Sequence, residues 1–327
     1  MTSLIHTLDF GPGLDVAAHS CASASALQTP ENQDNFVLID GKGRAVFMRD
    51  QCQRTVHLPD WPPGHARIAV LDGMGGHGNG RQAAEAVAEG LLRILACANL
   101  DELNGRLDAL HDSLQAHFVQ PDESGTARRP GTTLTLLELR PNQAPMLYHA
   151  GDSRLYEITS ERARPLTVDH VPATTFAMRG LLNEREWQQQ VHGEHRAQIS
   201  QAFILGNAIS DPHVLSGPLF PLNGDNLPFF LRALGDRRAL EVRSDALYLL
   251  ATDGFWACAK PADWVAQWPA LLAGLGAAAA IDRLFSIFMK TPPPGLHIDN
   301  LTAIALRFTP STVDETALPD AAEFPVF

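Results

Sequence analysis

Short apolar runs, separated by connections too short for a helix, constrain the fold of this chain more than any other feature. Strands joined by short links pair antiparallel, whereas parallel pairing needs a crossover of a dozen or more residues. Several runs are apolar at successive positions, and 132–139 is typical of a strand buried on both faces. The predicted strands are "FVLI" (36–39), "RIAVLD" (67–72), "TTLTLLEL" (132–139), "PMLYHA" (145–150), "SRLYEI" (153–158), "DALYLLATD" (245–253) and "LTAIALRF" (301–308).

Apolar residues spaced three and four apart lie between these groups of strands and predict two pairs of helices. The second pair is predicted at 261–268 and 271–290, followed by the breaker "TPPPG" and the last strand. Strands, two helices, several strands, two helices and a final strand together predict an α+β fold. The first pair is predicted from Ala84, Val87, Leu91 and Leu95, and then from Leu103, Leu107, Leu110 and Leu114.

A glycine-rich loop follows the strand at 67–72, and its Gly73, Gly75 and Gly78 match the G-x-G-x-x-G pattern of dinucleotide-binding proteins. That interpretation requires a second parallel strand ending in an acidic residue about 20 residues further on. Asp101 and Glu102 lie at that distance, but they are typical of a helix start. A dinucleotide-dependent oxidoreductase is therefore the weakest interpretation.

Aspartates stand at the ends of the predicted strands. A turn or cap role is the commoner explanation for any one of them. If the strand ends meet at one edge, however, carboxylates repel one another by a few kcal/mol at about 4 Å, and bound cations relieve this. Oxygen ligands without histidine or cysteine favour Mg²⁺ or Mn²⁺, and two such ions can activate a water for attack on phosphorus. The residues are Asp34, Asp72, Asp152, Asp253 and Asp299.

The motifs around these aspartates resemble, in order, those of the metal-dependent serine/threonine protein phosphatases, the PPM or type 2C family, in its bacterial form. The resemblance covers 15–308 and implies a four-layer sandwich of two antiparallel β-sheets flanked by helix pairs. It implies one phosphatase domain at 15–308, with an extension at 1–14, a flap or insertion at about 170–238 and a tail at 309–327. The motifs are "NQD" (32–34), "DGMGGH" (72–77), "GTT" (131–133), "AGDSRLY" (150–156), "LLATDGFW" (249–256) and "DNLTAIAL" (299–306).

Roles for single residues also follow from the resemblance. Asp72 would bridge two Mg²⁺ or Mn²⁺ ions, and the Gly73 carbonyl would bind one of them. Asp253 and Asp299 would complete the other ion's ligands, and Asp34 would act directly or through another ligand. Asp152 would help to hold a third, weaker metal. The implied reaction is hydrolysis of phosphoserine or phosphothreonine by a metal-bridged hydroxide, with no phosphoenzyme.

Some positions depart from the family pattern. Thr29 stands where many members place an arginine that grips the substrate phosphate, and Arg81 is a candidate substitute or an exposed helix arginine without a ligand. Met74 replaces the histidine of animal members. His77 is a second candidate for phosphate contact or a structural loop histidine. Ala257 replaces an aspartate that helps to bind the third metal in many relatives, which weakens the prediction of a third metal site.

Charge and composition limit the partners. With 37 acidic and 25 basic residues the chain carries a formal charge of −12, which argues against nucleic acid. No segment reaches the roughly 20 apolar residues that span a bilayer, so we expect a cytoplasmic protein, most simply a monomer, without a membrane partner. Expected partners are phosphoprotein substrates and a cognate serine/threonine kinase. Thr29 and Ala257 leave one alternative, a pseudophosphatase that binds phosphoproteins or a kinase without turnover.

Overall fold

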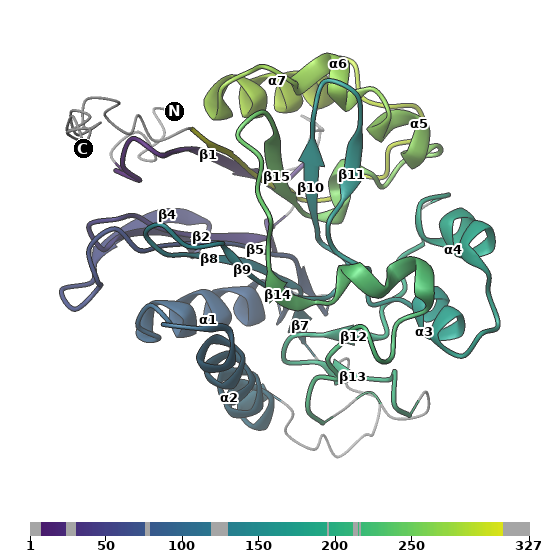
Figure 1. The fold of residues 1–327 in the computed structure, drawn as a ribbon, viewed down its shortest axis with the longest axis horizontal. Helices are drawn as coiled ribbons and strands as arrows, with labels where there is room; N and C mark the ends of the chain where they lie inside the picture. The colour runs from purple at the N-terminus through teal and green to yellow at the C-terminus, as the bar shows by residue number, and fades with distance from the viewer. Residues whose placement is uncertain are drawn as a thin grey trace, which may run out of the picture.

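Two antiparallel sheets packed face to face form the centre of the molecule (Figure 1). The computed structural model describes residues 8–23, 31–75, 79–118, 130–194, 196–211, 215 and 217–309. The five-stranded sheet has the order β1 (Leu14–Cys21), β16 (Leu301–Phe308), β15 (Leu247–Ala251), β10 (Arg154–Ile158) and β11 (Ala163–Pro165). The seven-stranded sheet has the order β14 (Arg237–Ala239), β9 (Met146–Ala150), β8 (Leu134–Leu139), β5 (Ala66–Leu71), β2 (Asn35–Ile39), β3 (Arg44–Arg49) and β4 (Cys52–His57).

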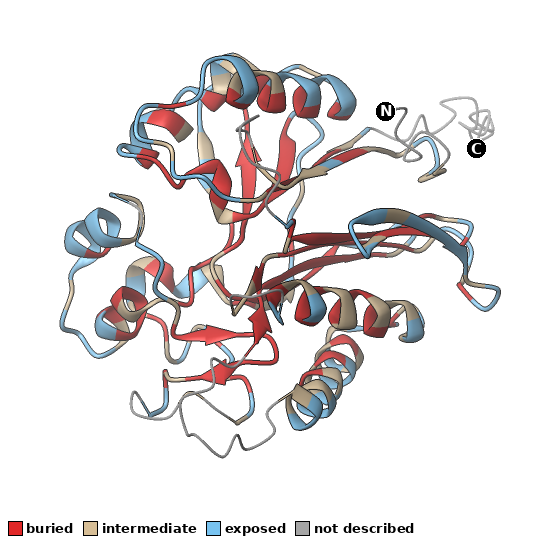
Figure 2. Cartoon of the chain, turned by 180° about the vertical axis from the view of Figure 1, so that it is seen from behind, coloured by how far each residue is buried: buried red, intermediate tan, exposed pale blue. Residues whose placement is uncertain are grey.

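The central strands bury side chains on both faces, which explains their unbroken apolar runs. Along β5, Ile68 and Val70 point into the layer between the sheets, while Ala69 and Leu71 face the helices. Figure 2 shows these strands as continuous buried ribbons. The layer between the sheets includes Phe36, Leu38, Ile68, Val70, Leu137 and Leu147 from one sheet and Leu155, Tyr248, Leu250, Ile304 and Leu306 from the other.

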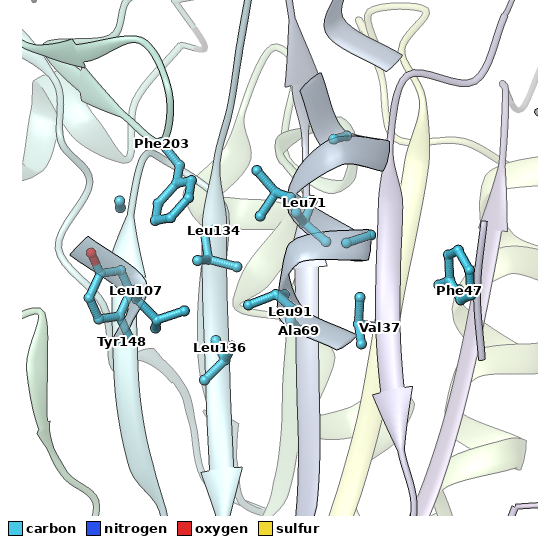
Figure 3. Packing of buried hydrophobic residues seen from close by; sticks show 14 of the residues in the cluster. Val37, Phe47, Ala69, Leu71, Leu91, Leu107, Leu134, Leu136, Tyr148 and Phe203 are labelled. Atoms are coloured by element: carbon cyan, nitrogen blue, oxygen red, sulfur yellow. The ribbon is translucent and has the colours of Figure 1, made fainter. Parts of the chain in front are cut away.

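Helices cover the outer face of each sheet and complete the four layers. α1 (Asn79–Arg93) and α2 (Leu100–Phe118) pack on the seven-stranded sheet. Figure 3 shows Leu91 and Leu107 of these helices beside Val37 and Leu134 of the strands. α5 (Pro261–Val265), α6 (Trp268–Leu272) and α7 (Ala277–Lys290) pack on the five-stranded sheet. The predicted α+β class and the four-layer sandwich are confirmed.

Two details of the helix prediction are wrong. Leu95 lies beyond the end of α1 and is 56% exposed. Arg67 explains this end, because its guanidinium donates hydrogen bonds to the carbonyls of Leu91, Ile94 and Leu95 and so terminates the helix. The segment 271–290 is interrupted between α6 and α7, where Gly274 adopts a φ of +80° that a helix does not allow.

The region expected to form a flap has a small hydrophobic core of its own beside the sandwich. It contains α3 (Pro172–Met178), α4 (Glu184–Val191), the short hairpin β12 (Gln201–Ala202) and β13 (Gly206–Asn207), and the 3₁₀ helix η2 (Phe229–Leu234). Trp187 of α4 packs in this core with Ala173 and Ala177 of α3 and with Leu227 and Leu231.

The glycine-rich loop does not belong to a dinucleotide-binding unit. α1 leads into α2 instead of a parallel strand, and β5 pairs antiparallel with both β2 and β8. Of the loop, Gly73 and Met74 form the two-residue strand β6 (Gly73–Met74), which pairs with β7 (Gly131–Thr132). None of the helices in the described ranges is long and apolar enough to cross a membrane.

Candidate metal centre

The antiparallel pairing brings the strand-end aspartates to one edge of the sandwich. Asn35 at the start of β2 pairs with Leu71 at the end of β5, so Asp34 and Asp72 are adjacent across these strands. Ala251 near the end of β15 pairs with Ala303 near the start of β16, which places Asp253 and Asp299 at the same edge. Asp152 lies in the turn that connects β9 of one sheet to β10 of the other.

Direct contacts join the two sheets at this edge. Thr252 Oγ1 donates a 2.8 Å hydrogen bond to Asp34 Oδ2, and the carboxyls of Asp72 and Asp253 are hydrogen-bonded to each other. Asp34 is 4% exposed, Asp72, Asp152 and Asp253 are half-buried, and Asp299 is exposed. The five aspartates predicted from the sequence thus form one group at the seam between the sheets.

Burial and mutual repulsion make these carboxylates unfavourable as free anions. Burial is the largest cause that raises the pKa of Asp72 well above its usual value, followed by the charges of Asp253, Asp34, Asp299 and Asp152. Burial also raises the pKa of Asp34 and Asp152 well above the usual value, with a contribution from Asp253 in each case. The pKa of Asp253 is raised chiefly by burial and lowered in part by its hydrogen bond with Asp72.

This donor set fits hard divalent cations. All five side chains offer only oxygen, and a cation among them would offset the mutual repulsion that, after burial, helps to raise the pKa values of Asp34, Asp72 and Asp152. As the side chains stand in the described ranges, no three acidic, histidine or cysteine residues form a closed ligand set. Ions at this edge would therefore take few protein ligands each and complete their coordination with water, after rotation of exposed groups such as Asp299.

Two glycines allow the backbone to approach closely beside the aspartates. A Cβ on Gly73 would lie 2.4 Å from both the Gln33 and the Gly80 carbonyl oxygens. A Cβ on Gly254 would lie 2.2 Å from the Asn300 carbonyl oxygen, so any side chain there would separate the segments that carry Asp253 and Asp299. Glycine is required at both positions for steric reasons.

A pair of hydroxyls ties Asp72 to the turn that carries Asp152. Thr133 Oγ1 accepts a 2.9 Å hydrogen bond from the Asp72 N–H and lies 2.6 Å from Ser153 Oγ. The Thr133 N–H in turn donates to the Asp72 carbonyl at 2.9 Å. Thr133 interrupts the strand predicted at 132–139, which is therefore split into β7 and β8, and this break belongs to the site.

Arg154 and Asp169 are neighbours of the centre that the sequence analysis did not single out. The Arg154 guanidinium donates to both carboxylate oxygens of Asp169, at 2.7 to 3.1 Å, and lies 4.5 Å from the centre of the Trp256 ring. The Asp169 charge helps to raise the pKa of Asp152, after burial and Asp253. Arg154 stands in the "GDSR" motif, but its pairing with Asp169 of "LTVDH" is a tertiary contact that no local pattern predicts.

A cavity of about 180 Å³ opens beside Asp152, between the sandwich and the α3–α4 region. Polar groups on its wall include Arg154, Asp169 and Gln198, and Phe176 is a 43% exposed apolar group there. The exposed Arg196 also lines it.

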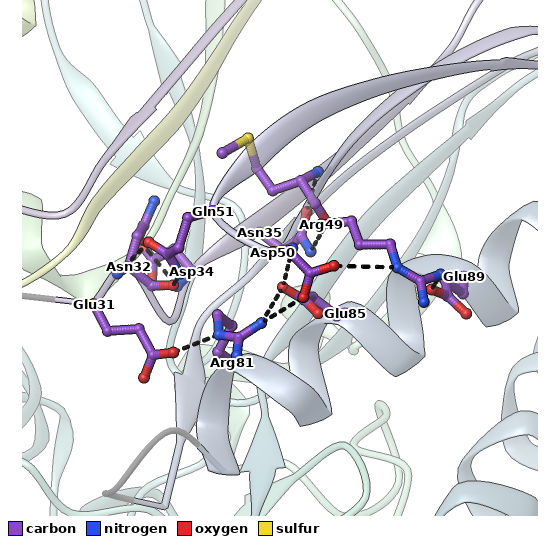
Figure 4. A network of polar contacts seen from close by, with 11 residues as sticks. Glu31, Asn32, Asp34, Asn35, Arg49, Asp50, Gln51, Arg81, Glu85 and Glu89 are labelled. Carbon is purple, nitrogen blue, oxygen red and sulfur yellow. Dashed lines mark hydrogen bonds and ion pairs between the residues drawn. The ribbon is translucent and has the colours of Figure 1, made fainter.

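Arg81 lies at the start of α1 in a network of carboxylates (Figure 4). Its guanidinium pairs with Glu31, Glu85 and Asp50, so a phosphate would have to displace these partners. His77 and Thr29 lie outside the described residues. Ala257 is fully buried and offers no carboxylate for a third metal.

Comparison with known proteins identifies the architecture. No family model matches the chain. Two solved structures align over 90% of this chain and 99% of their own: the serine/threonine phosphatase PstP/Ppp of Mycobacterium tuberculosis (21% identity, TM-score 0.58) and the serine/threonine phosphatase of S. agalactiae (16%, 0.62). A third is the catalytic domain of PstP in complex with two manganese ions (20%, TM-score 0.55, 90% of this chain, 98% of that chain). The chain has the fold of the PPM serine/threonine phosphatases.

A sequence relative agrees with this fold. The protein phosphatase PhpP of Streptococcus pneumoniae is 32% identical over 128 residues, which are 38% of this chain. The chain spans about half the length of this curated relative, 51%. The expected PPM-type resemblance is therefore confirmed for the fold and for a part of the sequence.

Proposed function

We propose that the chain is a metal-dependent protein phosphatase that hydrolyses phosphoserine and phosphothreonine. The observation that carries this proposal is the group of aspartates at the seam of a PPM fold, in which burial and neighbouring carboxylates raise the pKa of Asp72. An all-oxygen cluster of this kind is favourable with divalent cations and unfavourable without them.

Each aspartate has a proposed role. Asp72 and the Gly73 carbonyl would hold one ion, Asp72 with Asp253 and Asp299 a second, and Asp152 a weaker third. Asp34, which accepts from Thr252, would orient or complete this set. When bound, Mg²⁺ or Mn²⁺ ions lower the pKa of a coordinated water, orient it toward phosphorus and withdraw charge from the phosphate.

The remaining residues of the site bind and orient. The cavity beside Asp152 would hold the peptide that carries the phosphate, with Phe176 and Gln198 contacting its neighbouring side chains. Phosphoproteins, and a serine/threonine kinase that makes them, are therefore the proposed partners. The buried pair Arg154–Asp169 would keep the wall of that cavity in place.

Hydrolysis of p-nitrophenyl phosphate and of a phosphothreonine peptide tests the proposal, with Mn²⁺, with Mg²⁺ and with EDTA. We expect turnover with either metal and none with EDTA. Asp72→Asn and Asp253→Asn should each abolish turnover with the fold retained, whereas Asp112→Asn, an exposed carboxylate of α2, should leave it unchanged. Metal-independent turnover would contradict the proposal, and phosphopeptide binding without any turnover would indicate a pseudophosphatase.

A further inference from the structure

A fully buried histidine lies behind the turn that carries Asp152. His170 is 0% exposed and follows Asp169 at the base of the flap region. Its backbone N–H donates to the Gly151 carbonyl at 2.8 Å, and its side-chain Nδ1 lies 3.2 Å from the Gly151 nitrogen. One residue thus holds both backbone polar groups of the residue that precedes Asp152.

Gly151 needs this external support. Its φ of +119° is strained for any other residue, and a Cβ would lie 2.6 Å from Thr133 Cγ2. Glycine has the most flexible backbone of all residue types, so the direction of the Asp152 side chain depends on the groups that hold the turn.

The hydrogen bonds define the tautomer of His170. The Gln201 side chain accepts from the Phe220 N–H at 2.6 Å, which fixes its oxygen and directs its NH₂ group toward His170 Nδ1 at 3.0 Å. Nδ1 therefore faces two donors, from Gly151 and Gln201, and carries no proton itself. Burial and the neighbouring His149 ring hold the pKa of His170 well below its usual value, so the neutral ring carries its proton on Nε2.

The protonated nitrogen faces a buried carboxyl group. His170 Nε2 lies 3.5 Å from Oδ2 of Asp236, which is 1% exposed. Asp236 Oδ2 also accepts from the Leu222 N–H at 3.0 Å, and the Asp236 carbonyl accepts from the His149 N–H at 2.9 Å. The imidazole therefore lies between the segment before β14, to which Nε2 makes no hydrogen bond in the described part of the chain, and the Asp152 turn, which it contacts through Nδ1.

We propose that His170 is a positioning residue: through Gly151 it sets the direction of the Asp152 carboxylate and so the affinity of the centre for its more weakly held cation. This inference rests on the proposed function, because the direction of Asp152 matters only if the centre binds cations. Groups that orient metal ligands typically change affinity or activity by about 10- to 100-fold when they are lost.

Two substitutions separate the two nitrogens of the ring. The shorter amide of asparagine can place its oxygen near the position of Nδ1, so His170→Asn keeps an acceptor for Gly151. His170→Gln places its amide near Nε2 instead and leaves the Gly151 N–H without its partner. The matched control is His111→Gln, because His111 is also buried, accepts from the Ile204 N–H through Nδ1 at 3.0 Å and has Nε2 3.2 Å from the Gly217 carbonyl.

Mn²⁺ binding to the full chain, followed by the electron paramagnetic resonance signal of free Mn²⁺, is the first readout. We expect His170→Gln to weaken the weakest class of Mn²⁺ sites about 10-fold and to lower kcat for p-nitrophenyl phosphate. His170→Asn should recover most of this affinity, and His111→Gln should lower Tm without changing Mn²⁺ binding. Equal Mn²⁺ binding by His170→Gln and His111→Gln would overturn the proposal and reduce His170 to a structural role.

Imidazole ¹⁵N spectra of the metal-free wild-type chain give a second readout that needs no variant. They should show a pH-independent neutral ring with its proton on Nε2, and a proton on Nδ1 would overturn the proposal even if the variants do not fold. Failure of the proposed function would give a different result from failure of this inference. The wild type would then neither bind Mn²⁺ nor hydrolyse p-nitrophenyl phosphate, and all variants would behave like the wild type.

Discussion

Neutralising Asp253 should stabilise the metal-free chain while it abolishes turnover. The carboxyls of Asp72 and Asp253 are hydrogen-bonded, so one proton must be held between them. In Asp253→Asn the amide can donate this hydrogen bond to an ionised Asp72, so the pair carries a single charge, whereas the wild-type pair carries two charges once the shared proton is lost at higher pH.

The magnitude follows from Coulomb's law. Two unit charges about 4 Å apart repel by about 4 kcal/mol at an effective dielectric constant of 20. Water and side-chain rotation reduce this value in the wild type, so we expect a net gain of about 1 to 3 kcal/mol in the free energy of unfolding. For a chain of 327 residues that gain raises Tm by about 1.5 to 4.5 °C.

The pH dependence has a definite sign. Because the pKa of Asp72 is raised in the folded state, the folded chain holds a proton that the unfolded chain releases near its ordinary value of 3.8. Wild-type stability without metal therefore falls as pH rises from that value through the raised one. The advantage of Asp253→Asn should be larger at pH 8 than at pH 5.

Thermal unfolding followed by circular dichroism in EDTA, at both pH values, measures this effect. Mn²⁺ at about 100 times its dissociation constant should add about 2.7 kcal/mol to the free energy of unfolding of the wild type and less to that of the variant. With Mn²⁺ the wild type should therefore be the more stable of the two. Asp112→Asn, exposed on α2, is the control and should change Tm little. A Tm of Asp253→Asn in EDTA at or below that of the wild type would refute the reasoning.

Three further outcomes are expected. Glu138→Gln should lower the free energy of unfolding in urea by about 3 kcal/mol, because it leaves the fully buried Arg67 without its carboxylate partner. Gly254→Ala should lower Tm and Mn²⁺ affinity, since its Cβ meets the Asn300 carbonyl, whereas Gly105→Ala in open space on α2 should raise stability by about 0.5 to 1 kcal/mol. Arg81→Ala should change KM for a phosphothreonine peptide by no more than about twofold, because carboxylates already engage the Arg81 guanidinium. A rise of about tenfold in KM, or about 1.4 kcal/mol, would instead show that Arg81 binds the substrate phosphate.

The buried strands could be predicted from the sequence because both of their faces are covered. β15 contributes Leu247 and Leu249 to the helix-covered core and Tyr248 and Leu250 to the layer between the sheets, so its sequence is apolar throughout. β4 was missed, because it is an edge strand whose "CQRTVH" sequence is mostly exposed and polar. Its conformation depends on pairing with β3, which no local pattern contains.

The aspartates could be predicted because each stands next to an apolar strand. Their common location follows from antiparallel pairing, which the short connections also predict. The pairs that support them could not be predicted, since Asp34 and Thr252 are 218 residues apart and Arg154 meets Asp169 from another segment. For the same reason Leu95 fits the helical spacing and yet lies outside α1, because Arg67 ends that helix from a neighbouring strand.

The pairing of β1 with β16 affects how this protein can be made by a ribosome. These strands pair along their full lengths, from Leu14 with Phe308 to Cys21 with Leu301, and β16 separates β1 from the rest of its sheet. β1 therefore waits for β16, which is synthesised about 280 residues later, and a nascent chain cannot complete the seam where the aspartates meet until Phe308 has left the exit tunnel. Cation binding should thus begin only after β16 has been synthesised, and nascent chains that end before Phe308 should not hydrolyse phosphate esters.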